Sequence, residues 1–251
     1  MSSLREDFNA LPFQEVYKIL SELNAAPELT DKLIVGGGIA PYLLIETNSE
    51  RQHRDADLLV DEKDMTAVRD YLKKHHLYDA RYDSLSYQGV TRDHGVTARI
   101  NGFPVGFYPY NAVTDEATKE PAIDIYAYSF GETPDQIDLK ESHIVGFQKS
   151  DLCITKCLSD DSRMKIISPE VVVVSKLGKG KNNLRDKDKQ DLQAMVFTRM
   201  NAEKMKRIYH AFNHRGTRRS IAEKDVEKVS LDDILKIFRY NDLEIETTIS
   251  Q

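Results

Sequence analysis

Two aspartates separated by one residue, Asp55 and Asp57, are the residues of this sequence best suited to chemistry. Side chains alternate between the two faces of a β-strand, so both carboxylates would lie on the same face. Neighbouring carboxylates repel each other, and a hard divalent cation that also binds phosphate oxygens relieves that repulsion. The pair predicts a Mg²⁺ site, which Mn²⁺ can also fill. The alternative is that both aspartates are solvent-facing residues of a half-buried strand.

A run of three glycines at positions 36–38 follows the apolar residues 33–35. Bare backbone N–H groups ahead of a helix can approach an anion, which makes such a turn a candidate phosphate site. The run is not a dinucleotide fingerprint, because Pro41 stands where the last glycine belongs, and no Gly-Lys-Ser/Thr follows. Alone, it is most simply a structural turn. Together with the aspartate pair, it predicts chemistry on a nucleoside triphosphate.

Other residues fit the same chemistry. Arg51 and His53 precede the aspartates and offer cationic or donor groups to a triphosphate. Asp124 lies within an apolar segment, a costly place for an unpaired carboxylate. Three acids on adjacent strands could hold two metal ions for displacement at phosphorus. The third acid is assigned from the strand pattern alone, and the substitutes for it are Asp93, Asp115 and Glu120.

Hydrophobic periodicity and turn residues predict the elements that position these groups. We expect strands at 32–35, 55–60, 122–128, 143–147, 152–157 and 164–167, with a hairpin of 97–100 and 105–108 around Asn101-Gly102. We expect helices at 8–24, 39–47, 63–75, 169–178, 185–199 and 202–213, and a last one from Ser230. Ser168-Pro169 is typical of a helix start. The predicted fold is α+β: a mixed sheet flanked by helices over residues 1–167, then a helical bundle over 168–251.

Composition limits the class of protein. The 251 residues are 40% hydrophobic and 30% charged, as in ordinary globular proteins, and the net charge of −6 argues against non-specific coating of nucleic acid. No run approaches the roughly 20 apolar residues that span a bilayer, and the N-terminal residues lack the apolar core of a signal peptide. We therefore expect a cytoplasmic protein without a membrane partner. The two cysteines, Cys153 and Cys157, are expected to be small hydrophobic residues.

The motifs resemble those of the nucleotidyltransferases of the DNA polymerase β superfamily, whose signature is a hydrophobic residue, Gly-Gly or Gly-Ser, and a later Asp-x-Asp strand. Val35-Gly36-Gly37 and Asp55-Ala56-Asp57 match it. The form Arg51-x-His53-x-Asp55-x-Asp57 is similar to aminoglycoside and lincosamide nucleotidyltransferases. Lys176 and the segment from Arg185 to Leu192 resemble elements of those enzymes and of AbiEii-type toxin nucleotidyltransferases.

The resemblance implies roles for these residues. Gly36, Gly37 and Gly38 would face the phosphates, Asp55, Asp57 and Asp124 would bind metal, and Asp124 could accept the proton of an attacking hydroxyl. Lys176, and also Lys187, would neutralise triphosphate charge, and Arg185 would bind the nucleotide beside them. Asp188 and Asp191 either belong to the site or bond helices together.

The sequence therefore predicts a Mg²⁺-dependent nucleotidyltransferase that moves a nucleoside monophosphate from an NTP to a hydroxyl. Its acceptor is RNA, such as tRNA, in a toxin-like enzyme with an antitoxin protein partner, or a small molecule in an antibiotic-modifying enzyme. The basic run from Lys204 to Arg207, with His214, Arg215, Arg218 and Arg219, is either a solvated helix face or a surface for RNA. A catalytically silent binding module with the same fold is the remaining alternative.

Overall fold

The computed structural model describes residues 12–47, 50, 53, 56–76, 103–105, 123–130, 136–139, 142–177, 184–196, 200–213, 216–217, 232 and 234. Within these ranges, residues 103–105, 123–124, 136, 138–139, 142–145, 213 and 216–217 are described by their backbone alone. The account that follows concerns these residues.

A single mixed sheet forms the centre of the molecule. Its strands are β1 (Leu33–Val35), β2 (Ala56–Asp61), β3 (Phe103–Val105), β4 (Ile123–Phe130), β5 (Gln136–Leu139), β6 (Ser142–Val145), β7 (Cys153–Cys157), β8 (Arg163–Ile167) and β9 (Gly216–Thr217). Their order is β7-β8-β1-β2-β4-β5-β6-β9, with β3 paired to β4. The pairs β1–β8 and β2–β4 are parallel and the others antiparallel. The mixed sheet predicted from the sequence is confirmed.

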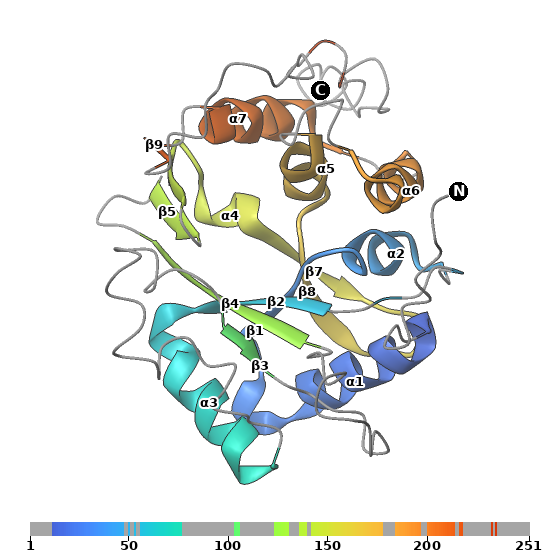
Figure 1. Ribbon diagram of the computed structural model, residues 1–251, viewed down its shortest axis with the longest axis vertical. Coiled ribbons are helices and arrows are strands. Elements are labelled where there is room, and N and C mark those ends of the chain that lie inside the picture. Colours follow the sequence, from blue (N-terminus) through green and yellow to red (C-terminus); the bar gives the residue numbers. More distant parts are fainter. Residues whose placement is uncertain are drawn as a thin grey trace, which may run out of the picture.

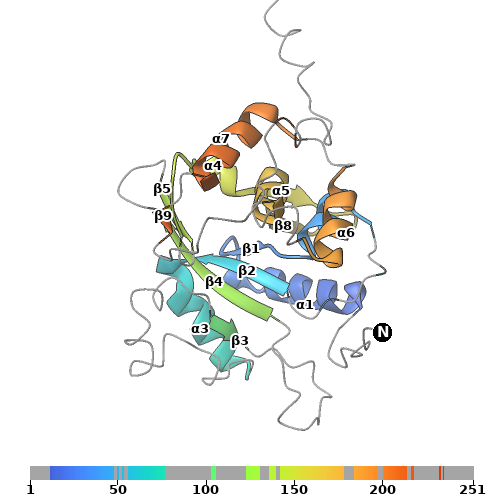
Figure 2. The same ribbon diagram turned by 45° about the horizontal axis from the view of Figure 1, so that its top comes forward.

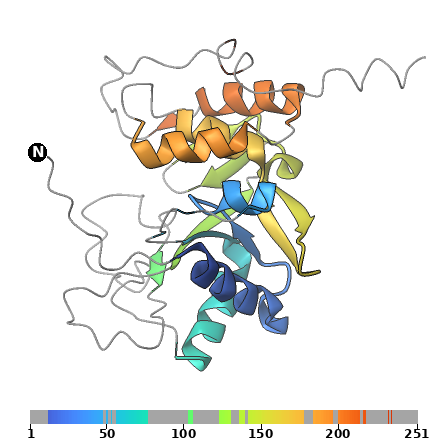
Figure 3. The same ribbon diagram turned by 90° about the vertical axis from the view of Figure 1, so that its right-hand side faces the viewer.

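Helices cover both faces of this sheet (Figure 1). They are α1 (Phe13–Ala25), α2 (Ala40–Ile45), α3 (Met65–Lys74), α4 (Lys149–Leu152), α5 (Pro169–Leu177), α6 (Asp186–Met195) and α7 (Ala202–Asn213), with 3₁₀ turns η1 (Pro27–Leu29) and η2 (Glu62–Asp64). Helices α1 and α3 lie on one face, and α2, α5, α6 and α7 lie on the other (Figure 3). The α+β class is thus confirmed.

Burial explains the arrangement. Helix α1 carries buried apolar residues at helical spacing, Phe13, Val16, Ile19, Leu20 and Leu23, and exposes its other face. Helix α5 has four consecutive buried valines at 171–174, because it lies between other elements rather than at the surface. Buried apolar residues on both sides of position 167 belong to one core cluster. Among the helices described, none is both long and apolar enough to cross a bilayer.

Several expected elements differ from the observed ones. Strand β5 and the single turn α4 were not predicted, and the strand expected at 143–147 is β6, which begins at Ser142. Of the expected hairpin, only position 105 is described, and it belongs to β3, which pairs with β4. Positions 97–100 and 106–108 lie outside the described residues. The Ser168 hydroxyl donates to the Asp151 carbonyl at 2.6 Å rather than capping α5.

Candidate active site at the glycine turn

The glycine turn connects β1 to α2 and is held against β2. The antiparallel register pairs Val35 with Leu58, and just beyond it the Gly36 N–H donates to the Asp57 carbonyl oxygen at 2.7 Å. The turn therefore continues the pairing of β1 with β2. In this way the sheet fixes the predicted glycine run beside the second aspartate of the predicted pair.

Gly37 contacts the Asp57 side chain so closely that no other residue fits. Its φ is +62°, and a Cβ added to it would lie 1.9 Å from Asp57 Oδ2. A Cβ on Gly36 would instead lie 3.5 Å from the Asp57 carbonyl oxygen, an ordinary contact. Glycine at position 37 thus satisfies a backbone requirement and a steric one. The result is a carboxylate packed directly on the half-buried backbone of Gly37.

Asp57 lies in the middle of the sheet, between the parallel strand β4 and the antiparallel strand β1. Ala56 and Leu58, its neighbours in β2, are buried, whereas Asp57 is half-buried. The parallel register sets the Cα of Asp57 beside that of Asp124. Figure 2 shows β1, β2 and β4 side by side. The backbone thus brings together three predicted positions: 37, 57 and 124.

The remaining predicted acids and Arg51 are not placed. Asp55, Arg51 and the substitute acids Asp93, Asp115 and Glu120 lie outside the described residues, and Asp124 is described by its backbone alone. Within the described part of the chain, no group of three or more Asp, Glu, His and Cys side chains is arranged to hold a metal ion. Asp57 is the predicted metal ligand whose side chain the structure shows.

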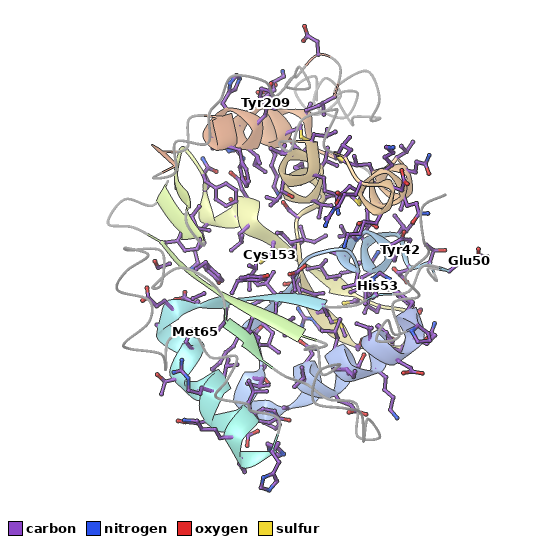
Figure 4. All side chains as sticks on the ribbon, viewed as in Figure 1. Tyr42, Glu50, His53, Met65, Cys153 and Tyr209 are labelled. Atoms are coloured by element: carbon purple, nitrogen blue, oxygen red, sulfur yellow. The ribbon has the colours of Figure 1, made fainter. Side chains whose placement is uncertain are left out.

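His53 lies in an aromatic environment. Its ring is 1% exposed and faces Tyr42 edge-on, with centroids 5.9 Å apart, and Phe13 at 6.2 Å. Figure 4 shows Tyr42 and His53 close together between α2 and α1. The sequence suggested a donor to a triphosphate at this position, and gave no sign of the aromatic neighbours. The role of His53 in nucleotide binding stays a prediction.

Lys176 forms ion pairs between α5 and α6. Its Nζ lies 2.7 Å from Asp191 Oδ2 and 3.4 Å from Asp188 Oδ1, and both carboxylates are 1% exposed. Arg185 adds hydrogen bonds to Asp188 from Nε at 2.8 Å and from Nη2 at 3.1 Å. Lys187 is half-buried on the same helix. Asp188 and Asp191 therefore bond α6 to α5, which is one of the two roles expected for them.

The basic run of α7 also pairs with buried acids. Arg207 binds Asp151 through Nε at 2.9 Å and Nη2 at 2.6 Å, which raises the pKa of Arg207. Lys204 lies 3.3 Å from Glu170, whose other oxygen accepts from the Asn201 N–H. Lys204 and Arg207 thus bond α7 to buried acids of α5 and α4, whereas Lys206 forms an exposed pair with Glu203. The sequence gave no signal for the two acids, because each partner lies far away along the chain; His214, Arg215, Arg218 and Arg219 lie outside the described residues.

Comparison with solved structures shows the fold. The solution structure of the antibiotic-resistance factor ANT(2'')-Ia matches 81% of this chain and 93% of its own length, with 14% identity and a TM-score of 0.50. The chain has a nucleotidyltransferase-type fold. The lincomycin-bound lincosamide antibiotic adenylyltransferase LnuA (16% identity, 74% of this chain, 98% of that one, TM-score 0.49) and ANT(2'')-Ia with adenylyl-2''-tobramycin (14%, 80%, 97%, 0.48) are also similar. No protein-family model and no curated protein matches the sequence.

Proposed function

We propose that this protein transfers a nucleoside monophosphate from an NTP to a hydroxyl group. The acceptor oxygen forms a bond to the α-phosphorus, the bond from that phosphorus to the bridging oxygen breaks, and pyrophosphate leaves. The observation that carries the proposal is the contact of Gly37 with Asp57. A half-buried carboxylate on a bare backbone turn, in this fold, provides acid and N–H groups in one place.

The donor set suits Mg²⁺. Oxygen ligands from one or two carboxylates, completed by phosphate oxygens, are typical of it, and Asp57 offers such oxygens beside position 124. Asp55, Asp57 and Asp124 would hold the metal, with Mn²⁺ as a substitute. A bound Mg²⁺ would supply charge neutralisation at the phosphates.

The remaining residues would bind and orient the nucleotide. Backbone N–H groups at positions 36–38 would face the phosphates, and Asp124 would accept the proton of the attacking hydroxyl. Arg51, Arg185 and Lys187 would contact the nucleotide, and the buried His53 would support the site without touching it. Lys176, held by Asp191 at 2.7 Å, would act as a fixed positive charge. Catalysis would come mainly from positioning and electrostatic stabilisation.

The ion pairs that α7 forms with α4 and α5 favour a small-molecule acceptor over RNA. Of the described basic residues of the expected surface, Lys204 and Arg207 direct their charge into buried carboxylates, whereas Lys206 pairs with the exposed Glu203. Binding phosphates with them would break those pairs. RNA remains the competing acceptor, and with it the antitoxin partner that the toxin resemblance implies.

The test is incubation with each α-³²P-labelled NTP and Mg²⁺, beside the variant Asp57→Asn. The acceptors are a panel of aminoglycosides and lincosamides and, separately, total RNA. Asp57→Asn should lower transfer by about 1000-fold. The matched control is Asp61→Asn on the same strand, which loses an ion pair with Lys63 at 2.9 Å and should retain activity.

Each outcome is informative. Label on an antibiotic would support the small-molecule acceptor, and label on RNA would support the toxin-like one. If no acceptor is labelled and no NTP binds, the protein is not this enzyme, and a catalytically silent binding module with the same fold is the alternative that stands. Equal loss in both variants would show that Asp57 has no special part in the reaction.

A further inference from the structure

We infer that three mutually packed rings, Phe13, Tyr42 and His53, position the glycine turn against Asp57. This set is the aromatic triangle. Its centroid distances are 6.3 Å for Phe13–Tyr42, 6.2 Å for Phe13–His53 and 5.9 Å for Tyr42–His53. These separations and the inclined ring planes are those that aromatic pairs prefer. The inference rests on the proposed function for its catalytic consequence.

The three rings come from three separate segments of the chain. Tyr42 lies on α2, which begins at Ala40 directly after the glycine turn. His53 lies four positions before Asp57 and shortly before β2 begins at Ala56. Phe13 is the first residue of α1, on the opposite face of the sheet from α2. The triangle therefore ties the segment after the turn to the segment before the aspartate.

Burial makes this connection rigid. Phe13 is 7% exposed, Tyr42 8% and His53 1%. Phe13 also stacks on Tyr17, at 6.1 Å and 8° between planes, and the Tyr17 hydroxyl donates to Asp160 in the connection between β7 and β8. A shift of any ring would leave a gap on one side or cause a clash on the other, since protein interiors are close-packed. The triangle is in turn anchored to the sheet.

The site tolerates little displacement. The Gly36 N–H lies 2.7 Å from the Asp57 carbonyl oxygen, and Gly37 leaves no room for even a methyl group beside the carboxylate. A misplacement of about 1 Å in an active site can cost about 100-fold in rate. Because α2 follows the turn directly, loss of the Tyr42 ring would let the turn move relative to Asp57. These rings are thus positioning residues, which would act through the turn.

The experiment compares Tyr42→Leu with Tyr42→Phe, which keeps the ring. The matched control is Phe147→Leu: Phe147 is 1% exposed and packs on Phe212 of α7 at 6.3 Å, in a different part of the core. For each, kcat, KM for the NTP and Tm are measured, with rates taken well below the lowest Tm. Tyr42→Leu should lower kcat by about 10- to 100-fold. Tyr42→Phe, which keeps the ring, should retain most of the wild-type kcat. Phe147→Leu should lower Tm while keeping kcat close to that of the wild type.

A second readout needs no activity. Amide hydrogen exchange of residues 33–39 and 56–61 should be faster in Tyr42→Leu and unchanged in Phe147→Leu. If exchange there is unchanged in Tyr42→Leu, or if kcat falls equally in both leucine variants, the inference is wrong. If the wild type transfers no nucleotide while exchange responds as expected, the proposed function fails and the positioning role stands.

Discussion

The region of helices α4 to α7 pairs its buried carboxylates with cations, and the glycine turn makes room for the half-buried Asp57. Among the helices, each such acid has a cation: Asp191 has Lys176 at 2.7 Å, Asp151 has Arg207 at 2.6 Å, and Glu170 has Lys204 at 3.3 Å. At the turn, Asp57 gains its space because Gly37 has no side chain. The helical region brings its cations and acids together from different elements. The glycine turn shapes its backbone around an acid.

The ion pairs among the helices stabilise the fold, whereas the glycine turn serves the proposed activity. A buried ion pair holds two helices in register, and removal of one partner leaves an uncompensated charge. Gly37 meets a backbone requirement, its positive φ, and a steric one, the Asp57 carboxylate. Glycine itself adds little stability, since it loses more conformational entropy than other residues on folding. We therefore expect substitutions among the helices to change stability, and substitutions at the turn to change activity.

The largest effect is expected from Asp191→Ala. Lys176 would keep Asp188, at 3.4 Å, as its carboxylate partner in a buried site. The free energy of unfolding should fall by about 3–5 kcal/mol, measured by urea denaturation. Asp186→Ala on the same helix removes a pair whose acid is 94% exposed, and should cause no measurable change. Similar small losses in both variants would remove the contrast between the two regions.

Gly37→Ala tests the other side of the comparison. An added Cβ would overlap Asp57 Oδ2 at 1.9 Å, whereas Gly36→Ala meets only an ordinary 3.5 Å contact. Transfer should fall by about 100-fold in Gly37→Ala, equivalent to about 2.7 kcal/mol in the barrier. Gly36→Ala should stay within several-fold of the wild type. Comparable rates for the two alanine variants would argue against close packing of the turn on Asp57.

Arg207→Lys sharpens the account of the helices. The guanidinium donates twice to Asp151, from Nε at 2.9 Å and Nη2 at 2.6 Å, and an ammonium cannot reproduce that fork. The free energy of unfolding should fall by about 1.5 kcal/mol. Lys206→Ala, which removes an exposed pair with Glu203, serves as the control. A stability equal to the wild type would show that charge alone suffices at this position.

The smallest effect is a pH dependence at the surface. Hydrogen bonds from Ser162 and then Tyr17 hold the pKa of Asp160 below its ordinary value of 3.8. Since the pKa is lower in the folded state, this stabilisation is complete above about pH 4 and is lost as the pH falls further. Tyr17→Phe should therefore be less stable than the wild type at pH 6, and the difference should shrink at pH 3. A difference that is constant with pH would assign the loss to packing.

Much of the sheet could be predicted because its strands carry local signals. The β1 segment is a run of apolar residues, the β4 segment alternates in polarity, and Ser168-Pro169 marks the start of α5. Strand β5 has four residues with two polar positions, and α4 is a single turn, so neither carries enough periodicity. Both depend on contacts with distant parts of the chain.

The candidate site could be predicted only in part, for a related reason. The glycines and Asp57 belong to a short motif that can be seen in the sequence. The contact of Gly37 with the carboxylate cannot, because it depends on the antiparallel register of β1 and β2. The partners of Lys204 and Arg207 lie more than thirty positions away, so the sequence shows a basic run where the structure has ion pairs. The packing of His53 on Phe13 likewise requires tertiary structure.

The pairing of Arg207 with Asp151 bears on how such a protein could evolve. Arg207 follows the predicted boundary at residue 167 and Asp151 precedes it, while β9 joins β6 across the same boundary. Recombination that exchanged the C-terminal helices as a cassette would leave the Asp151 carboxylate in the core without its guanidinium. Chimaeras divided at this point should therefore be viable only when the second parent also supplies an arginine at the position of Arg207, so the two halves of the gene are expected to be inherited together.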